Sequence, residues 1–412
     1  MRVAWIGPVP TRMGGVSFAG SQLVRALSRR GIELDCHVVR FPGELEPDVD
    51  PEAGLSFVEE AAKWDWDAWY ARHPLSRFVL GQTVRARAQS TLVARLLEAH
   101  RERPYDLVYQ FSQLELFAVR RHAGRLPPIV VHPEVHAAGE LRWHRREKAL
   151  SRRAEALLLR LGARAMLHAR ARVQRRDMRF VSGVIAPSAT FGELLIEDYG
   201  IERDRVHVVP NPIDLDRFHL AQRHPREPPA KLLFVSRLAV RKGVDQIVAL
   251  SHRLDDLRDE VEITVVGDAA QWSDYRALLD DANPRVLRYL GPRPPEELAA
   301  LMRAGTALLA PSRYEPFGLT VSEALASGLP VIVSDVVGAG ERVDPHCCRE
   351  VPAGDVNALE GAVRRLLKDV SQAGDRHLMA ERCRAEATRL WSPDVVGARL
   401  EGALRFVAGS GR

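Results

Sequence analysis

Cysteine and long apolar runs are both scarce in this sequence. Its 412 residues include four cysteines, none of which forms a CxxC pair or a His/Cys cluster at zinc-ligand spacing. We therefore expect free thiols in a reducing cytosol and no metal centre. No stretch approaches the roughly 18 apolar residues of a membrane-spanning helix, and the opening MRVAWIGPVP carries no signal-peptide cleavage pattern. The expected location is cytoplasmic, with peripheral attachment to the inner membrane face as the one membrane alternative.

Aromatic residues are also few, at 6% of the chain, and no helix-turn-helix pattern is present. The net charge of +5 favours an anionic partner, such as a nucleotide, an acidic membrane surface or nucleic acid. Nucleic acid ranks last among these, because the sequence offers no aromatic platforms on which bases could stack. We expect no nucleic-acid partner.

Strand and helix patterns alternate along the whole chain, and its length exceeds what one hydrophobic core usually serves. Short apolar runs suited to buried strands are separated by helical segments. This alternation predicts right-handed βαβ units and parallel sheets, and hence two Rossmann-like, doubly wound α/β domains. The expected strands are Arg2–Gly7, Ile32–Val39, Asp106–Phe111, Ile129–His132, Gly183–Pro187, Val206–Pro210, Lys231–Ser236, Val261–Val266, Val286–Leu290, Thr306–Ala310 and Pro330–Ser334.

The domain boundary is expected near Asn211-Pro212, where a polar, proline-rich stretch runs to Pro229. We place a first domain at residues 1–213, a second at residues 214–392 and a closing segment at residues 393–412. The closing segment follows Ser392-Pro393, a helix start, and predicts an amphipathic helix over Asp394–Val407.

The window Pro311–Pro330, PSRYEPFGLTVSEALASGLP, is the most informative about chemistry. It places a loop after the predicted strand Thr306–Ala310 and then a helix over Thr320–Ser327. Ligands of open α/β sheets bind beyond the carboxyl ends of strands, where helix N-termini offer backbone N–H groups to phosphate or sugar oxygens. The candidates for this role follow Pro316 and are Phe317, Gly318, Leu319 and Thr320. Glu315 and Glu323 add two carboxylates that suit sugar and ribose hydroxyls.

The window Leu233–Asp245, LFVSRLAVRKGVD, predicts a second loop at the end of a strand. Arg237 and Lys242 follow Ser236 in this loop, just before a helix. Two cations beside a helix N-terminus suit a diphosphate and would stabilise the negative charge that grows on a leaving nucleoside diphosphate.

These two windows resemble the retaining glycosyltransferases of family GT4, which have the GT-B fold. The resemblance rests on Arg237, Lys242 and the E-x7-E spacing of Glu315 and Glu323, with PFGL and GLPV around them. It extends to the N-terminal Gly14-Gly15 turn and to the VVPNPIDLDRF segment at 208–218. It implies two Rossmann-like domains facing a central cleft, with the final helix crossing back to the first domain.

The resemblance also implies a role for each matching residue. Arg237 and Lys242 would bind the donor diphosphate, Glu315 the transferred sugar and Glu323 the ribose. Ser236 and the segment Pro316–Thr320 would complete the donor site, and Gly14 and Gly15 would approach the diphosphate from the first domain. The donor would be a UDP- or GDP-sugar, the acceptor a hydroxyl group of a lipid, glycan or small molecule, and the reaction retaining.

Histidines after the predicted strand Ile129–His132 add further candidates. His132 is expected at the carboxyl end of the strand, in contact with the donor sugar, whereas Glu134 and His136 are candidates for the acceptor side. A satisfied structural histidine is the alternative for both His132 and His136.

The resemblance also implies that the reaction needs no metal or other cofactor, and the cationic pair would then take the place of a metal between the phosphates. Asp48-Val49-Asp50 and Asp65-Trp66-Asp67 match the D-x-D pattern of metal-dependent transferases, but both lie away from the predicted strand ends. Front-face attack, with the leaving phosphate accepting the acceptor's proton, is the favoured route to retention. A double displacement would need Glu315 as its nucleophile.

Two other readings compete with a transferase. An epimerase or a phosphorylase on a related fold is one, although an epimerase would lack the E-x7-E window and a phosphorylase would need a longer chain. The other is a catalytically degenerate scaffold at a membrane surface. The segment Arg142–Arg179 favours such a surface, because it carries twelve arginines and one lysine against three acidic residues. A solvated helix face is the plainer explanation of the same segment.

Overall fold

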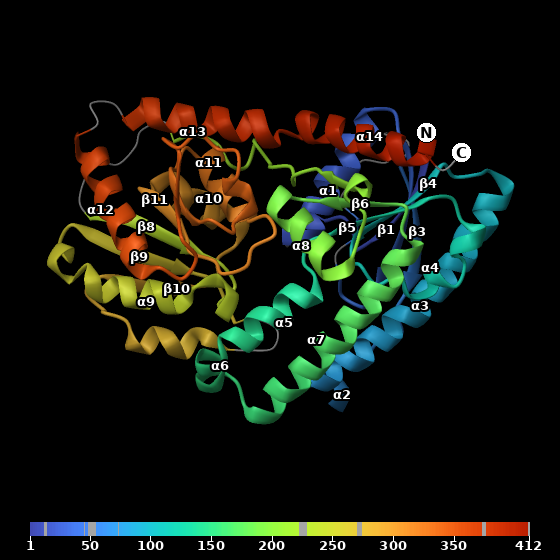
Figure 1. The fold of residues 1–412 in the computed structure, drawn as a ribbon, viewed down its shortest axis with the longest axis horizontal. Coiled ribbons are helices and arrows are strands. Elements are labelled where there is room, and N and C mark those ends of the chain that lie inside the picture. Colours follow the sequence, from blue (N-terminus) through green and yellow to red (C-terminus); the bar gives the residue numbers. More distant parts are fainter. Residues whose placement is uncertain are drawn as a thin grey trace. The chain divides into compact units, whose positions relative to one another are not determined.

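The structure, a computed structural model, describes residues 1–11, 15–44, 46–47, 55–72, 74–221, 229–269, 274–372 and 376–410. The chain forms two compact units, which are described separately (Figure 1). Unit 1 comprises Met1–Gly139, Gly162–Pro212 and Pro393–Arg412, and unit 2 comprises Glu140–Leu161 and Ile213–Ser392.

Unit 1 contains a parallel sheet of seven strands in the order β3-β2-β1-β4-β5-β6-β7. The order reverses between β1 and β4, so the chain leaves these neighbours in opposite directions and a crevice forms at their carboxyl ends. The strands are β1 (Arg2–Gly7), β2 (Glu33–Arg40), β3 (Leu55–Ala61), β4 (Leu107–Ser112), β5 (Ile129–Pro133), β6 (Gly183–Ala186) and β7 (Val206–Val208).

Helices pack on both faces of this sheet, and its central strands are therefore apolar on both sides. On one face, α1 (Gly15–Arg29) and the C-terminal α14 (Pro393–Ser410) bury leucines and valines against Val3, Trp5 and Phe111. On the other face, α3 (Pro74–Glu102) covers β2 and β3. The remaining helices of unit 1 are α2 (Trp69–Arg72), α4 (Phe117–Arg120) and α8 (Ala189–Tyr199). Two helices cross the division between the units: α5 (Ala137–Arg146) enters unit 2 at Glu140, and α7 (Leu157–Asp177) enters unit 1 at Gly162.

Unit 2 contains a second parallel sheet, of six strands in the order β10-β9-β8-β11-β12-β13. It repeats the strand order of unit 1, with the reversal between β8 and β11. The strands are β8 (Ala230–Val235), β9 (Val261–Val266), β10 (Leu287–Gly291), β11 (Ala307–Ala310), β12 (Val331–Ser334) and β13 (Cys348–Val351).

Alternate side chains of these strands enter two different cores. Leu232 packs with α9 (Val244–Arg253) and α12 (Val356–Gln372). Its neighbour Leu233 packs on the opposite face with α10 (Pro295–Ala304), α11 (Leu319–Ala326) and α13 (Arg376–Trp391). This two-sided burial explains the continuous apolar runs that identified the strands.

The arginine-rich segment folds differently from the single helical stretch that its composition suggested. It is divided into α5, α6 (Lys148–Ala154) and α7, and residues 140–161 pack with unit 2. The Tyr275 hydroxyl donates to Glu155 at 3.2 Å, and Arg153 pairs with Asp281 at 2.5 Å. The boundary predicted from composition placed this whole segment in the first domain.

The α/β fold class is confirmed, and each of the eleven predicted strands has a counterpart within a residue or two. Strands β3 and β13 were not predicted from the sequence, and each is an edge strand of its sheet. The helix predicted at Thr320–Ser327 is α11, and the one at Asp394–Val407 is α14, which packs on α1 in unit 1. Among the described residues, no helix has both the length and the hydropathy to cross a bilayer.

Candidate active site

The predicted donor residues of unit 2 gather at the point where its strand order reverses. β8 and β11 are hydrogen-bonded neighbours, and each ends in a loop at the same edge of the sheet. The loop after β8 carries Ser236 and Arg237 and passes through a 3₁₀ turn at Val240–Lys242 before α9 begins. The loop after β11 carries Glu315 and leads into α11.

Gly243 allows these two loops to touch. Its φ is +79°, and a Cβ atom at this position would lie 2.2 Å from the carbonyl oxygen of Pro311. The side chain of Gln246 donates to the same oxygen at 2.7 Å, and the Arg313 N–H donates to the Arg241 carbonyl at 2.7 Å. Only glycine combines the positive φ with so close an approach of another backbone.

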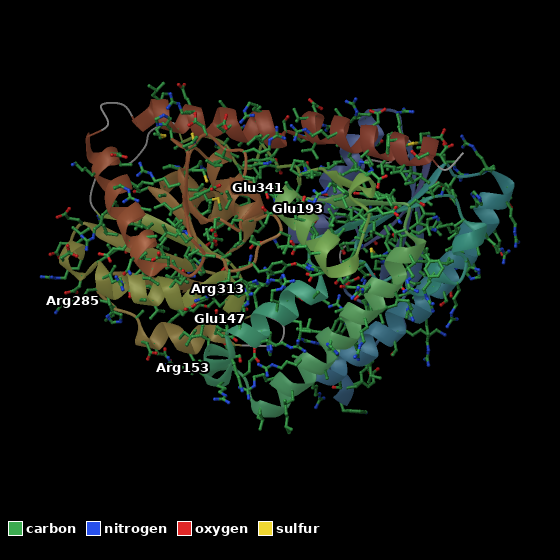
Figure 2. The ribbon with its side chains drawn as sticks, in the orientation of Figure 1. Glu147, Arg153, Glu193, Arg285, Arg313 and Glu341 are labelled. Carbon is green, nitrogen blue, oxygen red and sulfur yellow. The ribbon has the colours of Figure 1, made fainter. Side chains whose placement is uncertain are left out.

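Arg313 locks the same junction through its side chain. Its two terminal nitrogens donate to the two carboxylate oxygens of Asp245, both at 2.7 Å, in a bidentate pair. Its Nε lies 3.0 Å from Glu147 (Figure 2). Arg313 therefore holds the β11 loop to α9 and to the segment that follows α5. This role was not predicted from the sequence, because the partners lie 68 and 166 positions away along the chain.

Three cations surround Glu315 in this site. Lys242 Nζ forms an ion pair with the carboxylate, and Arg241 Nη1 lies 3.9 Å from it. The charge of Arg237 acts on the same carboxylate. Burial by itself would raise the pKa of Glu315, but the three cations hold this pKa below its ordinary value. Glu140 is a second carboxylate beside this cluster, 3.9 Å from Arg241 Nε and acting on Arg237. The site therefore carries three positive charges against two negative charges.

Lys242 is the most strongly perturbed of these cations. Its side chain is 16% exposed, and burial lowers its pKa to about 8 against the opposing effect of Glu315. Arg241, which the sequence analysis left out of the site, also donates to the Tyr314 carbonyl at 3.2 Å. An arginine two residues before Gly243 would have fitted the basic pattern, but only the fold shows that it faces Glu315 rather than solvent.

The N-terminus of α11 adjoins this basic cluster. Gly318 precedes the helix with a φ of +102°, and a Cβ atom there would lie 3.1 Å from Val337 and 3.3 Å from Glu315. Glycine thus allows the sharp entry into the helix. Among the described residues, no hydrogen bond uses the N–H groups of Leu319 or Thr320, as is usual in a first helical turn. These groups remain available to an anion or a hydroxyl oxygen.

Glu323 lies one turn further along α11. Burial raises the pKa of its carboxyl to about 7, and Arg217 offsets this only in part. The carboxyl is therefore about half ionised at neutral pH. A ligand with hydroxyl groups to donate would favour the ionised form.

In unit 1, His132 is enclosed near the end of β5. Its side chain is fully buried, its Nδ1 lies 2.6 Å from the Tyr109 hydroxyl, and its Nε2 has no hydrogen-bond partner among the described residues. Burial lowers its pKa to about 3, so the imidazole is neutral at physiological pH. The contact between Tyr109 and His132 was not predicted from the sequence. Tyr109 lies in the apolar run of β4, and nothing in that run indicates that its hydroxyl meets a side chain of β5.

The other N-terminal candidates lie in different surroundings. Glu134 Oε1 is 3.9 Å from His132 Nε2, and Glu134 also accepts a hydrogen bond from Asn211 at 2.8 Å. His136 is buried, with its Nε2 2.6 Å from Asp198 and its ring packed on those of Phe191 and Tyr199. The structure thus brings Glu134 to His132 but places His136 against α8.

The glycine turn after β1 is described only in part. Gly15 is the first residue of α1, whereas Gly14 lies outside the described residues, as does Asp48–Asp50. Asp65 and Asp67 lie in the loop after β3, where the Asp67 N–H donates to Asp65 at 2.9 Å. Among the residues that the structure describes, no group of three or more His, Cys, Asp or Glu side chains could hold a metal ion.

Comparison with known families gives matches over most of the chain. Residues 13–217 match the sequence model described as Glycosyltransferase Family 4, and residues 216–387 match the one described as Glycosyl transferases group 1. The chain is similar to a glycogen synthase of Mycobacterium tuberculosis, with 34% identity over 220 residues, which are 52% of this chain and 51% of the relative. The chain spans about half the length of the curated relatives it matches.

Two solved structures share the fold over nearly the whole chain. Sucrose-phosphate synthase from Thermosynechococcus elongatus has a TM-score of 0.72 at 18% identity, covering 99% of both chains. HepE from Anabaena, in complex with UDP and glucose, has a TM-score of 0.66 at 17% identity, covering 98% of this chain and 99% of HepE. At these identities the likeness shows the fold, which is GT-B.

Proposed function

The chain belongs to the family 4 glycosyltransferases, and we propose that it transfers a sugar from a UDP- or GDP-linked donor to a hydroxyl group of an acceptor. The proposed reaction retains the anomeric configuration and needs no metal. The observation that carries the proposal is the cluster of Arg237, Arg241 and Lys242 around Glu315, beside the N-terminus of α11.

The basic cluster suits a diphosphate because its charge is not balanced within the site. Glu315 and Glu140 together leave one of the three cations unbalanced, and burying unbalanced charge is unfavourable. A bound diphosphate would supply the missing negative charge. During transfer, that charge increases as the bond from the sugar to the phosphate breaks, so the cations would stabilise the transition state more than the ground state.

The rest of the donor would lie along α11 and its loop. Glu315 would accept hydrogen bonds from sugar hydroxyls, and the N–H groups of residues 317–320 would donate to sugar or phosphate oxygens. Glu323 would hold the ribose. HepE, with the same fold, has been solved with UDP and glucose, which supports a nucleotide sugar as donor without identifying the base or sugar used here.

His132 would assist by hydrogen bonding rather than by proton transfer. A pKa of about 3 leaves its imidazole neutral and too weak a base to take the acceptor's proton. When the Tyr109 hydroxyl donates to Nδ1, the ring hydrogen is on Nε2, a buried atom with no partner among the described residues. It would donate to a sugar oxygen once donor binding exposes the ring. Tyr109 is thus a proposed positioning residue.

Front-face attack is the proposed route to retention. The acceptor oxygen bonds to the anomeric carbon as the bond from that carbon to the phosphate oxygen breaks, and the acceptor's proton moves to the leaving phosphate. Glu315 is a poor nucleophile for a double displacement, because its carboxylate is paired with Lys242. A trapped covalent adduct of a sugar on Glu315 would overturn this route.

A peripheral contact with an anionic membrane is also proposed, because large apolar side chains are exposed in the arginine-rich segment. Leu157, Leu158 and Leu161 lie within the first two turns of α7 and are 59%, 79% and 50% exposed. Exposed Arg152 and Arg153 precede them on α6. Exposed leucines beside arginines suit the boundary of an anionic bilayer. The same feature favours a catalytically inactive membrane scaffold as the second candidate function.

A thermal-shift panel of UDP, GDP and their sugar conjugates, with and without EDTA, tests the main proposal. A ligand at about 100 times its dissociation constant should stabilise the chain by about 2.7 kcal/mol. We expect one base to stabilise selectively, without an effect of EDTA, and Lys242→Ala to lose that stabilisation. The same panel on the exposed Lys368→Ala serves as a matched control. No stabilisation by any nucleotide would favour the scaffold.

A further inference from the structure

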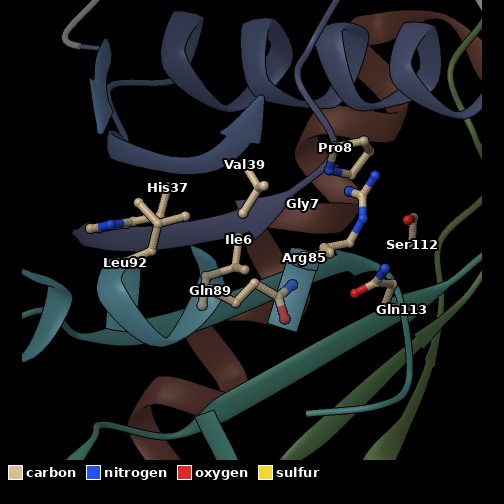
Figure 3. Close-up of a pocket in the computed structure, with 10 residues that line it drawn as sticks. All are labelled: Ile6, Gly7, Pro8, His37, Val39, Arg85, Gln89, Leu92, Ser112 and Gln113. Carbon is tan, nitrogen blue, oxygen red and sulfur yellow. The ribbon is translucent and has the colours of Figure 1, made fainter. Parts of the chain in front are cut away.

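A small cavity in unit 1 lies at the reversal of strand order there, apart from the residues assigned above. It has a volume of about 30 Å³ and is lined at the carboxyl ends of β1, β2 and β4 and by α3 (Figure 3). The lining residues are Ile6, Gly7, Pro8, His37, Val39, Arg85, Gln89, Leu92, Ser112 and Gln113. This position corresponds to the one that the basic cluster occupies in unit 2, where the order reverses between β8 and β11.

Among the residues that the structure describes, the polar lining of the cavity carries one positive charge and no carboxylate. Arg85 provides the charge, and Gln89, Ser112 and Gln113 provide hydrogen-bond donors. Burial lowers the pKa of His37 to about 4, so this imidazole is neutral at pH 7. Figure 3 shows Arg85 extending from α3 to the side of Pro8, at the end of the cavity where Ser112 and Gln113 lie.

Arg85 is partly buried, and a guanidinium in such a position usually has an acidic partner. No carboxylate among the described residues lies within ion-pair distance of it, and its Cζ lies over the ring of Phe41, 4.9 Å from the ring centroid. The nearest acidic influence is Glu44, whose carboxylate is used by the Phe41 N–H at 2.9 Å. The guanidinium fork is therefore free to bind an oxyanion.

Ser112 places a second polar group at the same point through an unusual backbone conformation. Its φ is +70°, one of two positive values among the described residues other than glycine. Such a conformation costs on the order of 1 kcal/mol, and it is found most often at functional sites. Here it turns the chain at the end of β4 and leaves the Ser112 side chain on the wall of the cavity, opposite α3.

We propose that this cavity binds an anionic substituent of the acceptor, a phosphate or a carboxylate, through Arg85 and Ser112. The inference rests on the proposed glycosyl transfer and adds a substrate class to it. The cavity has room for about two or three water molecules, each needing about 10–15 Å³. That is enough for a single oxyanion group but too little for a sugar ring, which would lie outside the cavity.

Calorimetric titration of the full chain with matched pairs of sugars tests the proposal. The pairs are glucose 6-phosphate against glucose, and glucuronate against glucose, with inorganic phosphate as a third probe. All titrations contain saturating nucleoside diphosphate, so that the cations of unit 2 are already occupied. We expect the phosphorylated or the carboxylated sugar to bind at least about tenfold more tightly than glucose.

Variants on α3 separate the role of Arg85 from general effects of charge. Arg85→Gln should remove the preference for the anionic sugar, a loss of about ten- to a hundredfold for a charge-assisted hydrogen bond. Arg85→Lys should keep part of it, because the charge remains but the fork is lost. Arg87→Gln changes an exposed arginine of the same helix and should leave the preference intact.

Equal binding of the anionic and neutral sugars would overturn the proposal, as would an unchanged preference in Arg85→Gln. Binding of inorganic phosphate but not of the anionic sugars would also overturn it, because the anion would then not be part of an acceptor. Binding of the nucleoside diphosphate is measured separately in every variant. Its absence in the wild type would contradict the proposed function instead, and the two failures are therefore distinguishable.

Discussion

The affinity for the donor diphosphate should fall as pH rises through about 8, because Lys242 then loses its proton. Burial lowers the pKa of this lysine to about 8 in the free protein. Only the protonated amine attracts a diphosphate, so the deprotonated form should bind weakly. The relevant perturbation is a pH titration of the wild type and of Lys242→Arg, whose guanidinium stays charged throughout.

The expected magnitude follows from the protonated fraction. With a pKa of about 8, about nine-tenths of Lys242 carries its proton at pH 7 and about one-tenth at pH 9. If only the protonated form binds, the dissociation constant rises about tenfold over this range, or about 1.4 kcal/mol of binding free energy. The ligand itself contributes little, since a terminal phosphate with a second pKa near 6 is already ionised.

Glu323 also titrates near pH 7. Its ionisation as pH rises would favour ribose binding, so it changes the affinity in the opposite direction to the deprotonation of Lys242. This contribution is common to the wild type and to Lys242→Arg, so the ratio of their dissociation constants isolates the lysine. Deprotonation of Lys242 does not lower the stability of the fold over the same pH range. Between about pH 8 and the ordinary pKa of 10.5, the unfolded state binds more protons at this residue, so its contribution to stability rises with pH.

Calorimetric titration with the nucleoside diphosphate that stabilises the chain, at pH 7, 8 and 9, provides the measurement. The wild type should weaken about tenfold relative to Lys242→Arg between the two ends of the range. A constant ratio would refute the assignment of Lys242 to the diphosphate, or the burial that lowers its pKa. Full loss of binding in Lys242→Arg at every pH would show instead that the ammonium geometry is required.

Three further predictions concern other parts of the chain. In urea denaturation, Gly243→Ala should lower the free energy of unfolding by about 1–3 kcal/mol more than Gly354→Ala. Both glycines have a positive φ, but of the two only Gly243 would place a Cβ against another backbone. Equal losses of stability would contradict this close approach. Tyr109→Phe should lower kcat up to about tenfold, because the hydrogen bond to His132 is lost, and should leave the dissociation constant for the diphosphate unchanged. An unchanged kcat would remove Tyr109 from the proposed site. Leu158→Gln should reduce the fraction of the protein that floats with vesicles of anionic lipid, because this side chain is 79% exposed. Sugar transfer to a water-soluble acceptor should stay intact. Unchanged flotation of the protein would contradict the proposed membrane contact.

Much of the fold could be predicted from the order of residues because the decisive signals are local. A strand buried on both faces needs a short apolar run, as in Arg2–Gly7, and a helix beside it needs apolar residues at helical spacing. The same dependence on local apolar runs explains why strands β3 and β13 were not predicted. Their exposed or mixed residues, such as the partly exposed Val58 and Glu59, do not give an apolar run, and they become strands by pairing with a neighbour.

The candidate donor site could be predicted in part, because its residues follow strand ends and lie in two short windows. Lys242 and Glu315 are 73 positions apart, yet both were assigned, since parallel strands bring their carboxyl ends to one edge. Arg241 and Arg313 were not assigned. An arginine in a loop is ordinarily a solvated charge, and no local pattern shows which carboxylate it will meet.

The sequence by itself determined the alternation of strands and helices, the α/β class and the residues that follow each strand end. These depend on periodicity and on turn residues within a few positions of one another. Only the tertiary structure decided which of those residues are buried, and hence the low pKa of Lys242, the neutral imidazole of His132 and, within the part of the chain that the structure describes, the lack of an ion pair for Arg85. Desolvation and electrostatic pairing depend on everything packed around a group, and most of those neighbours are distant along the chain.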